Sequence, residues 1–151
     1  MQLFIEIVRD GGAEIIGHSM REDDVHTFYA QPWVMVSSDG GIGMRHPRAT
    51  GTFPKVLGEF VREKHWLTLE EAVRRMTSLP AARLKLRDRG QIRKGMKADL
   101  VLLDAARVRD RSTFQQPELL SEGIEKVWVN GVLVWEGGKA TGARPGSVLR
   151  Q

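Results

Sequence analysis

A chain of 151 residues with 41% hydrophobic and 28% charged residues is long enough to bury a core and too apolar to be wholly disordered. It holds no cysteine, which excludes a disulfide framework and thiolate metal ligands. The net charge of +4 comes from basic residues, Arg74-Arg75 among them, that are interleaved with leucines and acids rather than gathered in one stripe. We therefore interpret them as a solvated surface and expect no nucleic-acid partner.

The first 30 residues bear on location and contain three predicted elements. Residues 1–6 lack a basic region and carry an early acid, and no stretch approaches the ~20 apolar residues of a membrane span, so we expect a cytoplasmic protein without a membrane partner. Residues 3–9 fit either a helix or a strand. A short strand is predicted at 13–17. Ser19 with Glu22 then forms a capping box, which predicts the next helix.

The apolar run 33–36 predicts a strand buried on both faces, because such strands read as continuous rather than alternating apolar segments. It ends at Ser37-Ser38-Asp39-Gly40, where a glycine-rich loop begins. Barrel enzymes place catalytic groups at the C-terminal ends of their strands. An Asp-Gly pair is also a common turn signal in any protein. From the residues alone, Asp39 is either a catalytic carboxylate or a turn residue.

Three helices are predicted next, at 52–61, 68–76 and 80–84. The second begins with another capping box, formed by Thr68 and Glu71. Glu71 and the acid before it complement the helix dipole, so we interpret them as structural.

Strand signals dominate after residue 86. The apolar run 100–103 predicts one strand, and 124–129 and 132–135 predict two more. The last two flank Asn130-Gly131, and Asn-Gly is the strongest two-residue hairpin signal because both positions tolerate positive φ.

Several motifs give the chain a family likeness. They are Ser37-Ser38-Asp39-Gly40, His46-Pro47-Arg48, Gly51-Thr52-Phe53-Pro54, Ala98-Asp99-Leu100-Val101 and Val129-Asn130-Gly131. This succession resembles the C-terminal part of the N-acyl-D-amino-acid deacylases (D-aminoacylases), a branch of the metal-dependent amidohydrolase superfamily. The resemblance runs from about Gly11 to Arg150 and favours a helix at 3–9. The first three motifs are specific to the branch, whereas Ala-Asp-Leu-Val is shared across the superfamily.

The resemblance implies an α/β fold. Residues 1–86 would form the closing strand–helix units of a metal-dependent-hydrolase TIM barrel, and residues 87–151 part of a β-sandwich domain. A complete barrel takes about 250 residues, so we expect this chain to be the C-terminal portion of a longer enzyme. An unpaired strand edge and uncovered apolar helix faces then predict self-association or pairing with the missing N-terminal part.

The activity implied by the resemblance is hydrolysis of the amide of an N-acyl-D-amino acid to a carboxylate and a free D-amino acid. The implied partner is that small-molecule N-acyl amino acid, and the implied cofactor is zinc. Zinc in such enzymes lowers the pKa of bound water and polarises the carbonyl. Asp39 would face the metal and move a proton from that water to the leaving nitrogen.

The substrate's α-carboxylate is the expected ligand of Arg48, which matches the arginine that binds it in the family. A planar guanidinium suits that task because it offers two parallel donors. His46 would orient Arg48, line the pocket, or serve only as a structural loop residue.

The metal centre is not encoded in this chain except for Asp39. The four histidines contain no His-x-His pair, so we expect the remaining zinc ligands in the upstream part and an isolated chain that is inactive. Two alternatives stay open. One is another amide hydrolase of the superfamily, such as a dihydropyrimidinase-like enzyme, although those lack the His-Pro-Arg-x-x-Gly-Thr-Phe combination. The other is a non-catalytic interaction module.

Overall fold

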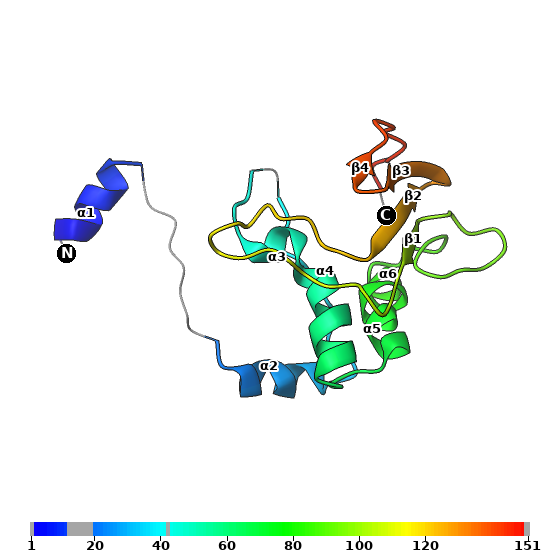
Figure 1. Cartoon of the computed structure of the whole chain (residues 1–151), viewed down its shortest axis with the longest axis horizontal. Coiled ribbons are helices and arrows are strands. Elements are labelled where there is room, and N and C mark those ends of the chain that lie inside the picture. The colour runs from blue at the N-terminus through cyan, green and yellow to red at the C-terminus, as the bar shows by residue number, and fades with distance from the viewer. Residues whose placement is uncertain (1, 12–19, 42, 150–151) are drawn as a thin grey trace.

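The computed structural model describes residues 2–11, 20–41 and 43–149 (Figure 1). The helices are α1 (Gln2–Arg9), α2 (Glu22–Tyr29), α3 (Pro47–Thr50), α4 (Thr52–Lys55), a π-helix η1 (Val56–Glu63), α5 (Leu69–Met76) and α6 (Ser78–Arg83). The strands are β1 (Leu100–Leu103), β2 (Ile124–Val129), β3 (Val132–Glu136) and β4 (Lys139–Ala140). In the part of the chain described, no helix has the length and apolarity that a membrane crossing requires. The strand predicted at 13–17 lies outside these residues.

A helix forms in each of the predicted helical regions. The helical alternative for 3–9 is confirmed by α1, which buries none of its side chains. The residue that precedes α2 is Arg21, whose side chain makes no capping hydrogen bond. Ser19, the predicted cap, lies outside the described residues. Three acids fill the first turn of α2, and they stabilise that end through the helix dipole.

The capping box of α5 is half formed. The Thr68 hydroxyl accepts a hydrogen bond from the Glu71 backbone N–H at 3.2 Å, as predicted. The Glu71 carboxylate bonds to Arg74 and Arg75 rather than completing the box, so this acid has a second structural function.

The strand predicted at 33–36 is wrong. The Val34 N–H donates to the Gln31 carbonyl and the Val36 N–H to the Arg75 carbonyl, both at 3.2 Å. Val36 is buried, whereas Trp33 is 66% exposed. A continuous apolar run forms a buried strand only when neighbouring strands cover it and complete its hydrogen bonds. Among the described residues, the strands belong to one sheet between residues 100 and 140, and none pairs with this run.

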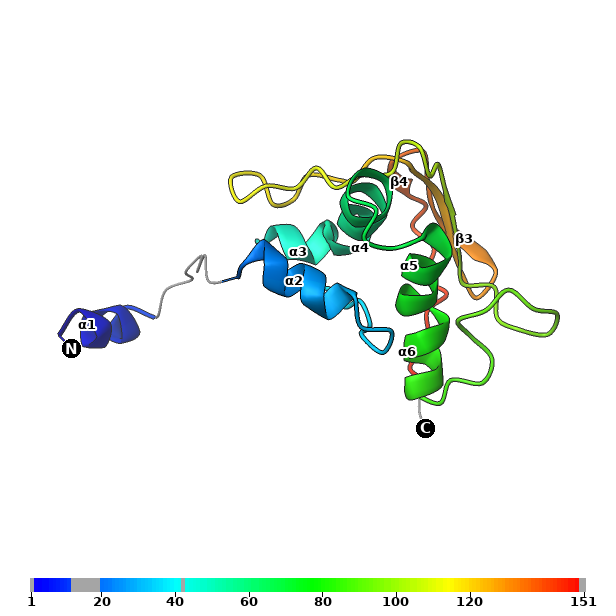
Figure 2. The same ribbon diagram turned by 90° about the horizontal axis from the view of Figure 1, so that it is seen from below.

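That sheet is antiparallel and has the strand order β1-β2-β3-β4. The predicted hairpin is confirmed, because β2 and β3 are joined by Asn130 at φ 49° and Gly131 at φ 79°. Both angles lie in the left-handed region that a two-residue hairpin turn requires. Figure 2 shows α5 and α6 following one another beside the sheet.

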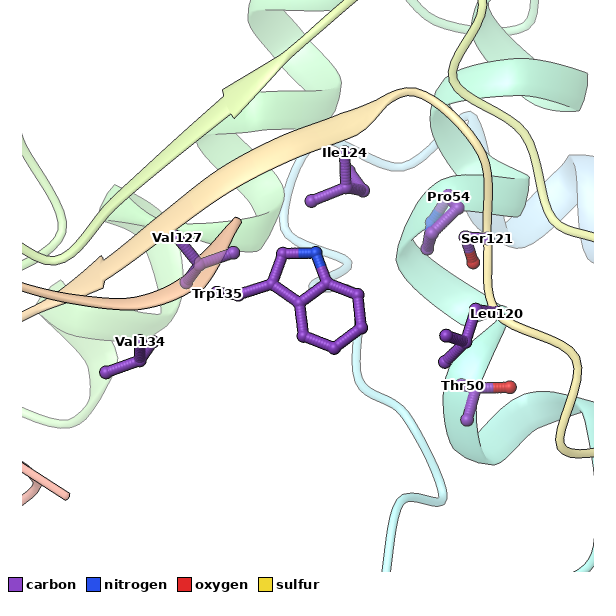
Figure 3. Close-up of a pocket in the computed structure, with 8 residues that line it drawn as sticks. All are labelled: Thr50, Pro54, Leu120, Ser121, Ile124, Val127, Val134 and Trp135. Atoms are coloured by element: carbon purple, nitrogen blue, oxygen red, sulfur yellow. The ribbon is translucent and has the colours of Figure 1, made fainter. Parts of the chain in front are cut away.

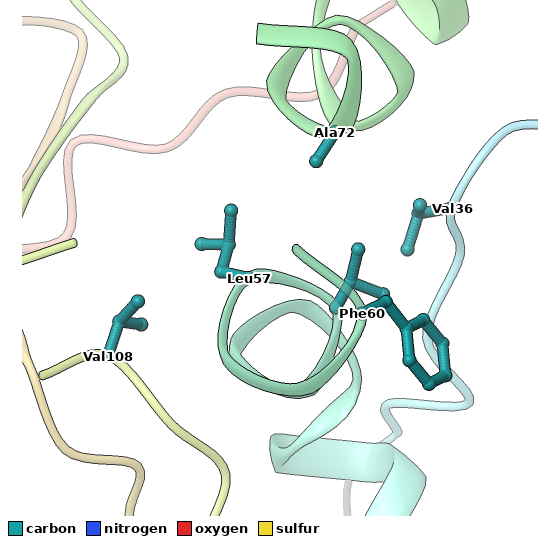
Figure 4. Packing of buried hydrophobic residues seen from close by; sticks show 6 residues of the cluster. Val36, Leu57, Phe60, Ala72 and Val108 are labelled. Atoms are coloured by element: carbon teal, nitrogen blue, oxygen red, sulfur yellow. The ribbon is translucent and has the colours of Figure 1, made fainter. Parts of the chain in front are cut away.

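The core joins the helices to the segment after β1. Val56, Leu57 and Phe60 of η1 pack with Ala72 of α5, as the predicted helical spacing required. Val36 and Val108 complete this cluster (Figure 4). Val56 and Val108 are each only 1% exposed. Leu103 and Ile124 pack against it from the sheet. The core therefore fixes η1 and α5 against the chain that follows β1.

Candidate functional site

The two side chains that the sequence marks most strongly lie together. Arg48 Nη2 is 2.6 Å from Asp39 Oδ2, so the guanidinium and the carboxylate form an ion pair. The side chains are 58% and 49% exposed. Exposed pairs of this kind contribute at most about 1 kcal/mol, so another carboxylate can displace Asp39 from Arg48.

The position of Arg48 depends on the start of α3. His46 is the N-cap residue, and its Nδ1 accepts a hydrogen bond from the Arg48 backbone N–H at 3.0 Å. Pro47 follows as the first helical residue, where its missing N–H costs nothing. His46 thus contacts Arg48 through the backbone, which fits the orienting alternative.

The interpretation of the basic residues as a solvated surface is wrong for Arg75 of α5. Its side chain is 4% exposed, and Arg75 Nε donates to the Glu71 carboxylate at 2.7 Å. Arg74 donates to the same carboxylate through Nε and Nη2. The hydrogen bonds from Arg74 and then Arg75 lower the pKa of Glu71 to about 2. A charged arginine is buried here because it lies next to a carboxylate that stays ionised.

The same two arginines hold the segment that leads to the Ser-Asp-Gly motif. Arg75 Nη1 donates to the Tyr29 carbonyl at 2.6 Å, and Arg74 Nη2 donates to the Pro32 carbonyl at 2.5 Å. The Val36 N–H donates in turn to the Arg75 carbonyl. Three hydrogen bonds to α5 therefore fix this segment, in place of the sheet neighbours that were predicted for it.

The residues described do not make a metal site by themselves. Among them, no three His, Cys, Asp or Glu side chains come close enough to hold a metal ion. Zinc sites in proteins use three or four protein ligands, and Asp39 is occupied by Arg48.

Two apolar clefts lie elsewhere. The larger, of about 970 Å³, lies between the helices α4–α6 and the strands β1 and β2. The smaller, of about 370 Å³, separates the sheet from α3 and α4, and the Trp135 indole points into it (Figure 3). Asp39 and Arg48 are not among the described residues that line either cleft. The clefts are therefore separate from the ion pair.

Comparison with known proteins gives consistent matches. The model of the amidohydrolase family matches residues 7–135. An N-acyl-D-aspartate deacylase from Alcaligenes xylosoxydans xylosoxydans is 45% identical over 145 residues, which are 95% of this chain and 29% of that protein. A D-aminoacylase from the same organism is 45% identical over 132 residues, covering 86% of this chain and 27% of that protein.

Solved structures of similar proteins also match this chain. A D-aminoacylase crystal structure, described as defining a novel subset of amidohydrolases, matches with a TM-score of 0.79 and 45% identity over 82% of this chain and 27% of its own. The N-acyl-D-glutamate deacylase from Bordetella bronchiseptica, solved with zinc and a phosphonate inhibitor, gives 0.81 and 46% identity over 87% of this chain and 28% of its own. This chain spans less than a third of the length of these relatives.

Proposed function

The chain belongs to the amidohydrolase family, and from this premise we propose that it is the C-terminal part of an N-acyl-D-amino-acid deacylase. The proposed reaction hydrolyses the amide of an N-acyl-D-amino acid to a carboxylate and a free D-amino acid. The observation that carries the proposal is the Asp39–Arg48 pair, at 2.6 Å. A carboxylate that would accept a proton lies beside a guanidinium that would bind the α-carboxylate, and this combination supports the proposal.

The proposal also assigns the architecture. Residues 1–86 would be the C-terminal segment of the amidohydrolase barrel, and residues 87–151 part of a β-sandwich, which the antiparallel sheet β1–β4 supports. The remainder of the enzyme would lie against apolar surface that this chain leaves open, and the 970 Å³ cleft beside β1 offers such a surface. Without that remainder, the same surface would favour self-association.

In the proposed mechanism, substrate binding and proton transfer are coupled through the ion pair. The substrate's α-carboxylate offers Arg48 the same type of acceptor as Asp39, so its binding releases the Asp39 carboxylate. Asp39 then accepts a proton from the water that attacks the amide carbonyl carbon. As the C–N bond breaks, the proton moves from Asp39 to the nitrogen, and the amino acid leaves as a free amine.

Zinc is the proposed cofactor of the complete enzyme, and Asp39 the ligand that this chain contributes. We expect isothermal titration of the isolated 151-residue chain to show no tight, stoichiometric zinc site, because a catalytic zinc needs three protein ligands. A tight site with one zinc per chain would contradict the assignment of the remaining ligands to another part of the enzyme.

The role of Arg48 is tested in a completed enzyme, in which this chain is joined behind the upstream part of the N-acyl-D-aspartate deacylase. Arg48→Ala should raise KM for an N-acyl-D-amino acid by about 10- to 100-fold, because a charge-assisted contact made in both ground and transition states is lost. The KM of a neutral analogue, whose α-carboxylate is replaced by an amide, should change little. Arg45→Ala removes an exposed arginine from the loop that precedes α3 and is the matched control.

Two outcomes would contradict the proposal. If Arg48→Ala preserves the preference for the carboxylate substrate over the neutral analogue, another group binds the carboxylate. If the unmutated completed enzyme folds and binds zinc but hydrolyses no N-acyl-D-amino acid, the chain is better described by the non-catalytic alternative.

A further inference from the structure

A loop from the second half of the chain contacts the helix that carries Arg48. The loop spans residues 109–122 and is closed at its base, where Arg109 and Glu122 exchange backbone hydrogen bonds of 3.2 and 3.0 Å. Their side chains pair at 2.7 Å, and Arg111 adds a second ion pair to Glu122 at 2.9 Å. Figure 1 shows this loop, in yellow, reaching over α3. Its ends are therefore fixed independently of α3.

The loop also has internal order. Asp110 Oδ1 accepts hydrogen bonds from the Ser112 N–H at 2.8 Å and from the Ser112 hydroxyl at 2.7 Å. Further along, the Thr113 hydroxyl oxygen accepts from the Gln116 N–H at 3.0 Å, and the Thr113 N–H donates to the Gln116 carbonyl at 3.2 Å. These hydrogen bonds lie within the loop and form a turn around residue 114 without any contribution from α3.

Three contacts join the loop to α3 and its cap. The Ser112 hydroxyl lies 3.1 Å from the Pro47 carbonyl, and the Thr50 hydroxyl donates to the Pro117 carbonyl at 3.2 Å. The Phe114 ring meets the His46 ring edge to face, with centroids 5.2 Å apart and an interplanar angle of 86°. Edge-to-face packing of this kind is favourable and directional.

These contacts form a short chain of positioning. Phe114 restricts the His46 ring, and Nδ1 of that ring holds the backbone N–H of Arg48. We propose that the loop 109–122 is a positioning element for Arg48, and that Phe114 sets the affinity for the substrate's carboxylate by holding His46. The inference rests on the proposed function in one respect, the role of Arg48 in binding that carboxylate. Phe114 is a positioning residue and contacts no reacting atom.

The first experiment does not depend on activity. In the 151-residue chain, Phe114→Ala should raise the hydrogen-exchange rate of the Arg48 amide about two- to tenfold. The variant loses the edge-to-face contact that restrains the His46 ring, and this ring accepts the hydrogen bond of that amide. Phe114→Tyr keeps the ring edge and should restore the slow rate. Phe28→Ala, which truncates a phenylalanine that is 60% exposed on α2, is the matched control and should leave Arg48 unchanged.

The backbone N–H of Ala72 donates a hydrogen bond to the Thr68 carbonyl at the start of α5, and its exchange rate reports whether the fold is intact. Faster exchange at Arg48 with Ala72 unchanged supports the proposal. Equal acceleration at both amides, or none at Arg48, overturns it. Thr50→Val, which removes the hydrogen bond to the Pro117 carbonyl, provides a second variant with the same expected direction.

The second experiment uses the completed enzyme and separates this inference from the function it rests on. Phe114→Ala should raise KM for the N-acyl-D-amino acid about two- to tenfold while kcat changes less than twofold, and Phe114→Tyr should restore KM. If Arg48→Ala raises KM and Phe114→Ala does not, the positioning role is wrong and the proposed function stands. If Arg48→Ala itself leaves KM unchanged, the proposed role of Arg48 fails, whatever the exchange rates show.

Discussion

Replacement of Asp39 by asparagine should lower kcat of the completed enzyme by about 10²–10⁴-fold, the usual contribution of general acid–base catalysis. Asparagine has nearly the same shape as aspartate but cannot accept a proton from water at the required step. The substrate's carboxylate would still bind Arg48, which loses its competing partner in the variant, so KM should not rise. Steady-state kinetics with a single N-acyl-D-amino acid would separate the two effects.

The control for this experiment is Asp24→Asn, which neutralises an exposed aspartate in the first turn of α2. It changes the net charge by the same amount and should leave kcat unchanged. Near-normal turnover of Asp39→Asn would show that Asp39 is not the proton acceptor of the proposed mechanism. Asp39 would then be interpreted as a turn residue.

Replacement of Glu71 by glutamine should destabilise the 151-residue chain by up to about 3 kcal/mol, because removing the carboxylate of this partly buried pair leaves the guanidinium charge uncompensated. The charge left behind is that of Arg75, whose side chain is 4% exposed. Urea unfolding followed by circular dichroism would measure the change. Glu70→Gln is the matched control, since Glu70 is exposed and precedes Glu71 in the same turn of α5.

The pH dependence of this difference has a defined sign. The pKa of Glu71 is lowered to about 2 from its ordinary value of 4.5, so the folded state binds its proton less readily than the unfolded state does. The stabilisation is therefore complete above about pH 4.5 and is lost as the pH falls toward about 2. The difference between the original chain and Glu71→Gln should shrink over this range. A difference independent of pH would show that Glu71 acts by packing rather than by charge.

Features encoded by neighbouring residues could be predicted from the sequence. The hairpin at Asn130-Gly131 depends on two residues that tolerate positive φ, and both adopt it. The cap at Thr68 depends on one hydroxyl and an N–H three residues later. These signals are complete within a few residues, so no distant part of the chain is needed to interpret them.

Features that depend on distant partners could not be predicted in this way. The run 33–36 has the composition of a buried strand, but its backbone N–H groups donate to the carbonyls of Gln31 and, on α5, Arg75. Arg75 resembles any helical arginine until the segment from Tyr29 covers it. Asp39 and Arg48 were singled out because of their motifs, whereas their ion pair and the contact of Phe114 with His46 are tertiary and carry no local signal.

Gly51 has a consequence for protein engineering. A Cβ built on Gly51 would overlap the carboxylate of Asp110, which Ser112 holds in place. Alanine at this position would push Asp110 away from Ser112 and disturb the loop from the helix side. In loop grafting between homologues, a donor loop with Asp110 keeps its Asp110–Ser112 hydrogen bonds only beside glycine at position 51, so the two positions should be transferred together.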